Sequence, residues 1–142
     1  MTTQTKPAGE VILAELFNLL SQPARIQILL VIREEPACVC HLMAALGMRQ
    51  ASISQHLMTL RKAGWVNPQR DGRNIYYSLA DQRLVELIQQ AAAISGVSLS
   101  KIDEISRRPL DYCPCPKCHP ELPPEYSCKV VPLEYQKKSQ AR

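Results

Sequence analysis

Apolar residues recur at helical spacing over the first part of the chain. The pattern predicts one helix over residues 9–20 and a second directly after it, capped by Ser21 and with Pro23 in its first turn. Two glutamates and a proline at residues 34–36 end the second helix. We therefore expect two nearly adjoining helices at the start of the fold.

A short helix, a glycine and a longer amphipathic helix are expected next. The shorter helix runs over about residues 38–46 and stops at Gly47, and the longer one runs over about residues 50–63 and stops at Gly64. The longer helix should bury one stripe, formed by Ile53, Leu57 and Leu60. Its other face is polar and is therefore free for a partner.

Two β-type runs and one further helix complete the regular part of the chain. Residues 65–66 and 75–79 flank an Asp-Gly pair at 71–72, which is a strong local signal for a hairpin. The last helix opens at Asp81 and continues to about Gly96. This order predicts a mainly α fold with a small β-hairpin wing (α+β), that is, a winged helix-turn-helix.

The composition changes after Gly96. Residues 97–142 hold 7 of the 11 prolines and four of the six cysteines. Prolines at this density prevent a regular helix or a central strand. We therefore divide the chain into a winged helix-turn-helix domain over residues 8–96 and a Cys/Pro-rich tail over residues 97–142.

Composition limits where the protein works. No apolar run approaches the roughly 18 residues that a membrane-spanning helix needs, and the first residues do not resemble a secretory signal. We therefore expect a cytoplasmic protein with no membrane partner.

In a reducing compartment, six cysteines indicate metal binding or redox chemistry and not disulfides. The net charge of +4 permits a nucleic-acid partner without indicating one.

The polar face of the fourth predicted helix suits DNA recognition. In a helix-turn-helix the second helix of the pair enters the major groove, and the wing reaches a neighbouring groove or phosphates. The side chains that we expect to contact DNA are Arg49, Gln50, Ser52, Ser54, Gln55, His56 and Arg61 on the helix, and Arg73 at the wing tip.

The stretch from Leu16 to Leu87 resembles the arsenic-responsive repressor (ArsR/SmtB-type) family of bacterial metal sensors. The motifs that carry the resemblance are FNLLSQPAR at 17–25, CVCHL at 38–42, QASISQHL at 50–57, LRKAG at 60–64, and DGR at 71–73 with the tyrosines at 76 and 77. The resemblance implies a homodimer built from the terminal helices, which binds a palindromic operator in double-stranded DNA and releases it when an ion binds. No small organic substrate is expected.

The pair Cys38 and Cys40 lies at the start of the third predicted helix. The positive end of a helix lowers the pKa of a thiol and so favours the thiolate that binds metal. Residues two apart on a helix do not face one another, so joint ligation requires Cys38 at the helix cap or a distorted first turn. Relatives often carry a third thiol three residues after the second one, where this chain has Met43. The last predicted helix contains no histidine, so the zinc site that some relatives have there is not expected.

The tail offers four more thiols. They are Cys113, Cys115, Cys118 and Cys128. They form either a self-contained structural zinc site or, together with Cys38 and Cys40, a composite sensor site to which the partner subunit can also contribute. Soft thiolates suit arsenite, cadmium, lead or zinc, and an iron–sulfur cluster is also compatible. The neighbouring histidines, His41 and His119, are expected to be solvated and not ligands.

Two other functions compete with metal sensing. A redox-responsive repressor would use the same DNA-binding module and oxidise its thiols. A thiol oxidoreductase would use the Cys-x-x-Cys spacing of Cys115 and Cys118, but that chemistry normally lies at the start of a helix after a strand, and this motif lies in a proline-rich tail. We therefore do not expect an enzyme.

Overall fold

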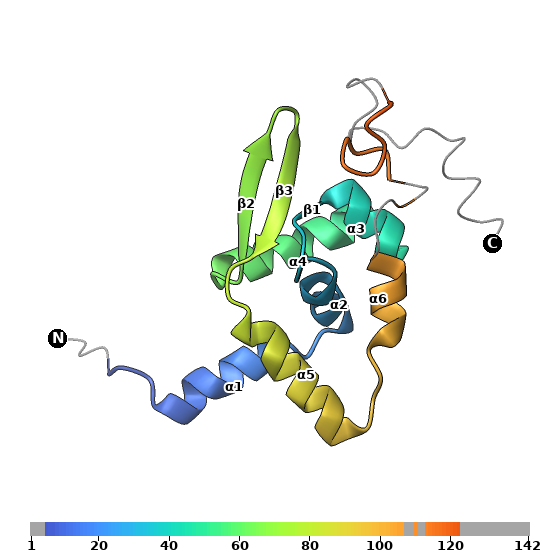
Figure 1. The fold of residues 1–142 in the computed structure, drawn as a ribbon. Coiled ribbons are helices and arrows are strands. Elements are labelled where there is room, and N and C mark those ends of the chain that lie inside the picture. The colour runs from blue at the N-terminus through green and yellow to red at the C-terminus, as the bar shows by residue number, and fades with distance from the viewer. Residues whose placement is uncertain (1–4, 107–109, 111–112, 123–142) are drawn as a thin grey trace.

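The computed structural model describes residues 5–106, 110 and 113–122. Its helices are α1 (Gly9–Leu19), α2 (Pro23–Val31), α3 (Val39–Leu46), α4 (Gln50–Lys62), α5 (Arg83–Ser95) and α6 (Ser100–Ser106), and its strands are β1 (Ala37–Cys38), β2 (Val66–Asp71) and β3 (Asn74–Leu79) (Figure 1). The predicted winged helix-turn-helix is confirmed: α3 and α4 form the helix pair, and β2 and β3 form the wing.

The core is built around α2. Four consecutive residues at the end of this helix, Ile28 to Val31, are buried, and α3, α4, α5 and α6 surround the helix in Figure 1. The predicted stripe of α4 lies in the same core, with Ile53, Leu57 and Leu60 each at most 2% exposed. Burial of this stripe fixes the orientation of α4, so the opposite face points to solvent.

The wing is an antiparallel hairpin in a sheet of order β1-β3-β2. Asp71 pairs with Asn74, which leaves a two-residue loop whose first residue, Gly72, has a φ of 61°. A positive φ at this position is what tight hairpin turns require, and glycine reaches it without steric cost. Strand β1 pairs Ala37 with Tyr77 and Cys38 with Tyr76. The sequence did not predict this strand, because two residues are too short to show a period.

The chain differs from expectation at the start of α2. Ser21 was predicted as the cap, but the helix starts one residue later, after Gln22, without a side-chain cap. The Ser21 hydroxyl donates instead to the carbonyl of Asn18, back into the end of α1. Pro23 occupies the first turn as predicted, so its missing N–H leaves less for a cap to satisfy.

Helix α6 was not predicted and lies within the segment assigned to the tail. Ile102 of this helix and Leu99, directly before it, pack on the core, and Asp103 forms an ion pair with Arg33, which follows α2. The prolines of the tail begin only at Pro109, so they do not interrupt it. Helix α6 therefore carries the chain from α5 back towards α3.

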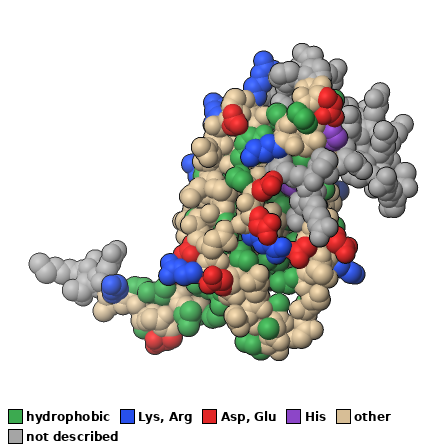
Figure 2. All heavy atoms as spheres, in the orientation of Figure 1, with side chains coloured by type: hydrophobic (Ala, Val, Ile, Leu, Met, Phe, Trp, Pro, Cys, Tyr) green, Lys and Arg blue, Asp and Glu red, His purple; other side chains and the backbone are tan. Residues whose placement is uncertain are grey.

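Helix α1 leaves the body of the molecule and has no buried residue (Figure 1). The large apolar side chains exposed on α1 and at the end of α5 are Val11, Ile12, Leu13, Phe17, Ile94 and Val97. Apolar side chains, green in Figure 2, gather where Figure 1 places these two helices. Within the described part of the chain, no helix has both the length and the apolarity to cross a bilayer.

Candidate DNA interface and metal centre

Helix α4 is the helix that we expect to enter the major groove of DNA, and a tight turn joins it to α3. Gly47 ends α3 with a φ of 63°, and Arg49 is the first flanking residue of α4. The predicted contacts Arg49, Gln50, Ser54, Gln55 and Arg61 are exposed, and Ser52 is half-buried. Arg73 is exposed in the two-residue loop of the wing. Basic and acidic side chains are interspersed over the face shown in Figure 2. The order of helix, turn, helix and wing is what indicates a DNA interface.

His56 differs from the other predicted contacts. Its ring is half-buried, and Nδ1 accepts a hydrogen bond of 3.4 Å from Nε of Arg25 on α2. Burial, and secondly the positive charge of Arg25, lower the pKa of His56 below its usual 6.5. The histidine is therefore held neutral against α2, and its role as a DNA contact remains a prediction.

Cys38 lies where β1 ends and α3 begins. It is the cap residue of α3, and its Sγ accepts from the backbone N–H of His41 at 3.4 Å. The cap is one of the two arrangements that we predict joint ligation with Cys40 to require, the other being a distorted first turn. The backbone leaves the sheet here, so the thiol lies beside the helix start and not along its side.

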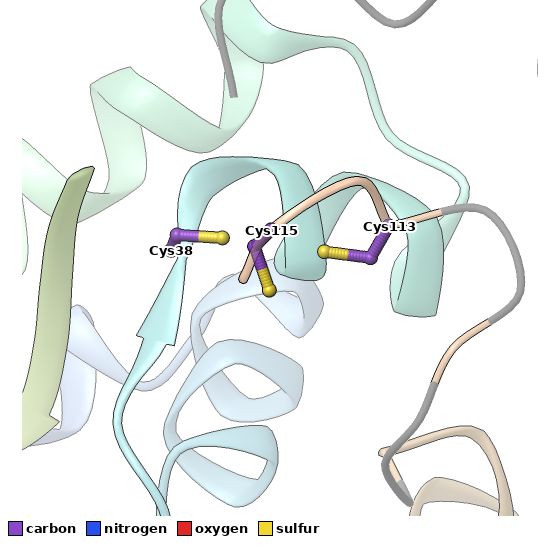
Figure 3. Close-up of side chains that lie close together, drawn as sticks. All are labelled: Cys38, Cys113 and Cys115. Atoms are coloured by element: carbon purple, nitrogen blue, oxygen red, sulfur yellow. The ribbon is translucent and has the colours of Figure 1, made fainter. Parts of the chain in front are cut away.

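The tail brings its thiols to this helix start. The Sγ atoms of Cys38, Cys113 and Cys115 lie within 4.8 Å of one another, and the three residues are at most 1% exposed. Figure 3 shows Cys38 at the start of α3 and both tail cysteines with their sulfurs turned towards the same space. We call these three residues the sulfur group. Three convergent thiols are a donor set that fits a soft ion.

A second set of donors adjoins the first and shares Cys113. A ring nitrogen of His41 and the Sγ atoms of Cys113 and Cys118 also lie within 4.8 Å of one another. We call these three residues the mixed group. Nδ1 of His41 is 3.4 Å from Sγ of Cys118. Imidazole and thiolate together fit zinc and similar divalent ions.

Hydrogen bonds inside the cluster shift the pKa values of its thiols in different directions. Bonds from the thiols of Cys113 and Cys115 lower the pKa of Cys118 far below its usual range, because donors stabilise a thiolate. The pKa of Cys113 is raised by its bonds to Cys115 and Cys118 and by burial. Of Cys113 and Cys118, the thiol beside His41, Cys118, is therefore the one that ionises more readily.

The other cysteines and the histidine that the sequence offers as donors lie outside both groups or outside the described residues. Cys40 is 4% exposed and packs in the same cluster, but it belongs to neither group. Cys128 lies outside the described residues. His119 is also in neither group: its Nδ1 contacts Glu121 at 2.8 Å and its Nε2 contacts the carbonyl of Leu110 at 3.1 Å.

The expectation that His41 is solvated was wrong. Its ring is only 2% exposed, because the tail covers the start of α3. The spacing contained a signal for this, since His41 is three residues after Cys38 and residues at that spacing share a helix face.

The tail also reaches the wing. Nζ of Lys117 lies 4.3 Å from the centre of the Tyr76 ring, a cation–π contact. Tyr76 is on β3 and pairs with Cys38 across the sheet. The cluster therefore connects the tail with the start of α3 and with strand β3 of the wing.

Comparisons with known proteins agree with this architecture. Residues 22–67 match the family described as bacterial regulatory protein, arsR family. The HTH-type transcriptional repressor SmtB of Mycobacterium tuberculosis is 40% identical over 97 residues, which cover 67% of this chain and 72% of that protein. A probable mercury resistance operon repressor of Streptomyces lividans is 31% identical over 100 residues, covering 68% and 77%. The crystal structure of Rv0081 of M. tuberculosis superposes with a TM-score of 0.58 at 34% identity, covering 64% of this chain and 92% of that one. This chain therefore belongs to the arsR family of bacterial regulatory proteins, and it is a DNA-binding transcriptional regulator and not an enzyme.

Proposed function

We propose that this metal-responsive transcriptional repressor senses a soft ion with thiolates from α3 and from the tail of the same chain. The observation that carries the proposal is the convergence of Cys38 with Cys113 and Cys115 within 4.8 Å in a buried position. Buried thiols that converge from distant parts of a chain without forming a disulfide are well arranged to share an ion. This arrangement favours the composite sensor site over a structural zinc site confined to the tail.

The donor chemistry limits the class of ion. Neither group of donors found among the described residues contains a carboxylate, and hard ions such as magnesium or calcium prefer oxygen. Arsenite, cadmium, lead and zinc all fit thiolate or thiolate and imidazole donors. The Streptomyces relative is named for mercury resistance, which is consistent with a thiophilic signal for this chain.

The repressor acts on DNA as a homodimer. Helix α1 carries four exposed apolar side chains and buries none within the protomer. A face of this kind gains stability when a second copy covers it. Two-fold pairing places two α4 helices on successive major grooves of a palindromic operator.

The ion site is linked to both parts of the DNA-reading unit. Cys38 caps α3, which packs directly against α4 through the turn at Gly47. Cys38 also pairs with Tyr76 of the wing strand. An ion that draws the tail onto Cys38 therefore acts on α3 and on the wing together. A coupling free energy of about 1 to 3 kcal/mol, typical of allosteric proteins, would lower operator affinity about 5- to 150-fold.

The test is a titration of reduced, metal-free, full-length protein on its own promoter DNA. Arsenite, cadmium, lead, zinc and copper(I) are added separately, and the bound ions per subunit are counted. We expect at least one soft ion to release the DNA. Cys113→Ser should abolish release while the metal-free protein still binds the promoter, and Cys40→Ala, which changes a buried thiol of the same cluster outside both groups, should keep the response.

Two outcomes would overturn the proposal. An undiminished response in Cys113→Ser would remove the tail from the sensor site. Release by peroxide and by no ion would identify a redox-responsive repressor instead.

A further inference from the structure

The two donor groups in the cluster differ in chemistry and share one residue. The sulfur group, Cys38, Cys113 and Cys115, offers three thiols, and the mixed group, His41, Cys113 and Cys118, offers two thiols and one imidazole nitrogen. All five side chains are at most 4% exposed. Only Cys113 belongs to both groups.

We infer that this cluster has two mutually exclusive binding modes: the sulfur group takes a trivalent metalloid such as arsenic(III), and the mixed group takes a divalent ion such as zinc or cadmium. The inference rests on the proposed function, since it assumes that ions bind at this cluster. It adds that His41 is a ligand for one class of ion and is dispensable for the other.

Charge balance assigns each ion to its group. A charge buried in a protein is costly unless it is neutralised. Three thiolates neutralise a trivalent ion, and two thiolates with a neutral imidazole neutralise a divalent one. The opposite assignments leave a net charge in a site whose members are almost completely shielded from water.

Both binding reactions balance without an oxidant or reductant. Arsenous acid, As(OH)₃, reacts with three thiols to form three As–S bonds and release three waters. A divalent ion displaces the protons of Cys113 and Cys118 and accepts a lone pair from His41 in the tautomer protonated on Nε2. Nδ1, the atom that faces Cys118 at 3.4 Å, is then free to donate that lone pair.

Exclusivity follows from the position of Cys113. Its sulfur is within 4.8 Å of the donor atoms of both groups, so two ions held at once would share this thiolate and lie within a few ångströms of each other. The four thiolates of the cluster would then carry four negative charges against five positive ones, which leaves a net charge in a buried site. Binding of one ion therefore excludes the other.

The experiment measures arsenite and cobalt(II) binding to reduced, full-length protein. Cobalt(II) serves as a spectroscopic probe for the divalent mode, because its thiolate charge-transfer and d–d bands report the ligands. The unaltered protein should bind one equivalent of either ion, and arsenite should bleach the cobalt bands. His41→Asn should weaken cobalt binding by about 10- to 100-fold or more, the range that loss of supporting groups already produces at metal sites, and should leave arsenite binding intact.

Cys38→Ser should show the reverse pattern. Serine is a good helix cap, so its hydroxyl can accept from the His41 N–H as the thiol does and preserve the start of α3. Cys115 is only in the sulfur group, so Cys115→Ser should weaken arsenite binding and leave cobalt binding intact. Cys118 is only in the mixed group, so Cys118→Ser should weaken cobalt binding and leave arsenite binding intact. His119→Asn is the matched control, because His119 directly follows Cys118 but is in neither group, and the variant should bind both ions normally.

The outcomes separate this inference from the proposed function. Equal losses of both ions in His41→Asn and in Cys38→Ser would show a single shared site and overturn the two modes. Simultaneous binding of arsenite and cobalt would overturn exclusivity. Absence of binding by either ion to the unaltered protein would refute the proposed ion site itself.

Discussion

The apolar face of α1 allows a quantitative test of the proposed dimer. We choose Phe17→Ala because Phe17 is 50% exposed in the protomer and because α1 has no buried residue that the change would disturb. If a second copy covers this face, the exposed half of the ring becomes buried only in the dimer.

The expected effect follows from the exposed fraction. Complete burial of a large apolar side chain contributes about 1.5 to 3 kcal/mol, so burial of the remaining half contributes about 1 kcal/mol per subunit. Two-fold symmetry counts this contact twice, which gives about 2 kcal/mol for the dimer. Removal of the ring should therefore raise the dimer dissociation constant by about 30-fold.

Sedimentation equilibrium would measure the dissociation constant, and fluorescence anisotropy would measure operator binding at protein concentrations on either side of it. Ile75→Ala is the control, since Ile75 is 41% exposed on strand β3, one residue after the pair that closes the wing loop. Figure 1 shows this loop away from α1 and α5. Ile75→Ala should leave dimerisation unchanged. A Phe17→Ala protein that dimerises as tightly as the unaltered chain would refute the assignment of this face to the dimer.

Two further predictions concern the DNA-reading unit. Arg73→Ala should weaken binding to all DNA sequences alike and reduce the slope of log affinity against log salt by about 1, because one phosphate contact is lost; unchanged affinity at every salt concentration would exclude Arg73 from the interface. His56 should titrate below 6.5 in an NMR experiment, and its pKa should rise in Arg25→Gln, where the repelling charge is gone. Because the folded-state pKa is the lower one, the contribution of His56 to stability is complete above about pH 6.5 and declines as the pH falls below it; an equal pKa in both proteins would contradict the role of Arg25.

Much of the DNA-reading unit could be predicted from the sequence. The stripe of Ile53, Leu57 and Leu60, the stop at Gly64 and the turn at Gly72 all depend on residues within a few positions of one another. Helical period and positive φ at glycine are local properties, so they can be recognised without knowledge of the fold. The cap position of Cys38 was one of two arrangements that the sequence left open, the other being a distorted first turn of the helix.

The ion site was predictable only as a list of donors. Cysteine in a reducing compartment indicated a soft ion, but periodicity says nothing about which thiols meet. His41 and Cys118 are 77 residues apart in sequence and 3.4 Å apart in space. Strand β1, which precedes His41, and helix α6, which precedes the tail cysteines, were not predicted, since β1 is two residues long and α6 lies in the segment that we assign to the proline-rich tail.

The sequence by itself determined helices α1 to α5, the wing, the face of α4 that can contact DNA and the soft-donor chemistry of the candidate ion site, because each is encoded in residue type and short spacing. Only the tertiary structure decided that the tail folds back onto α3, that the donors divide into a sulfur group and a mixed group, and that Cys113 lies in both. The physical reason is that contacts between distant segments depend on how the whole core packs and closes the chain into loops, and no local pattern records that.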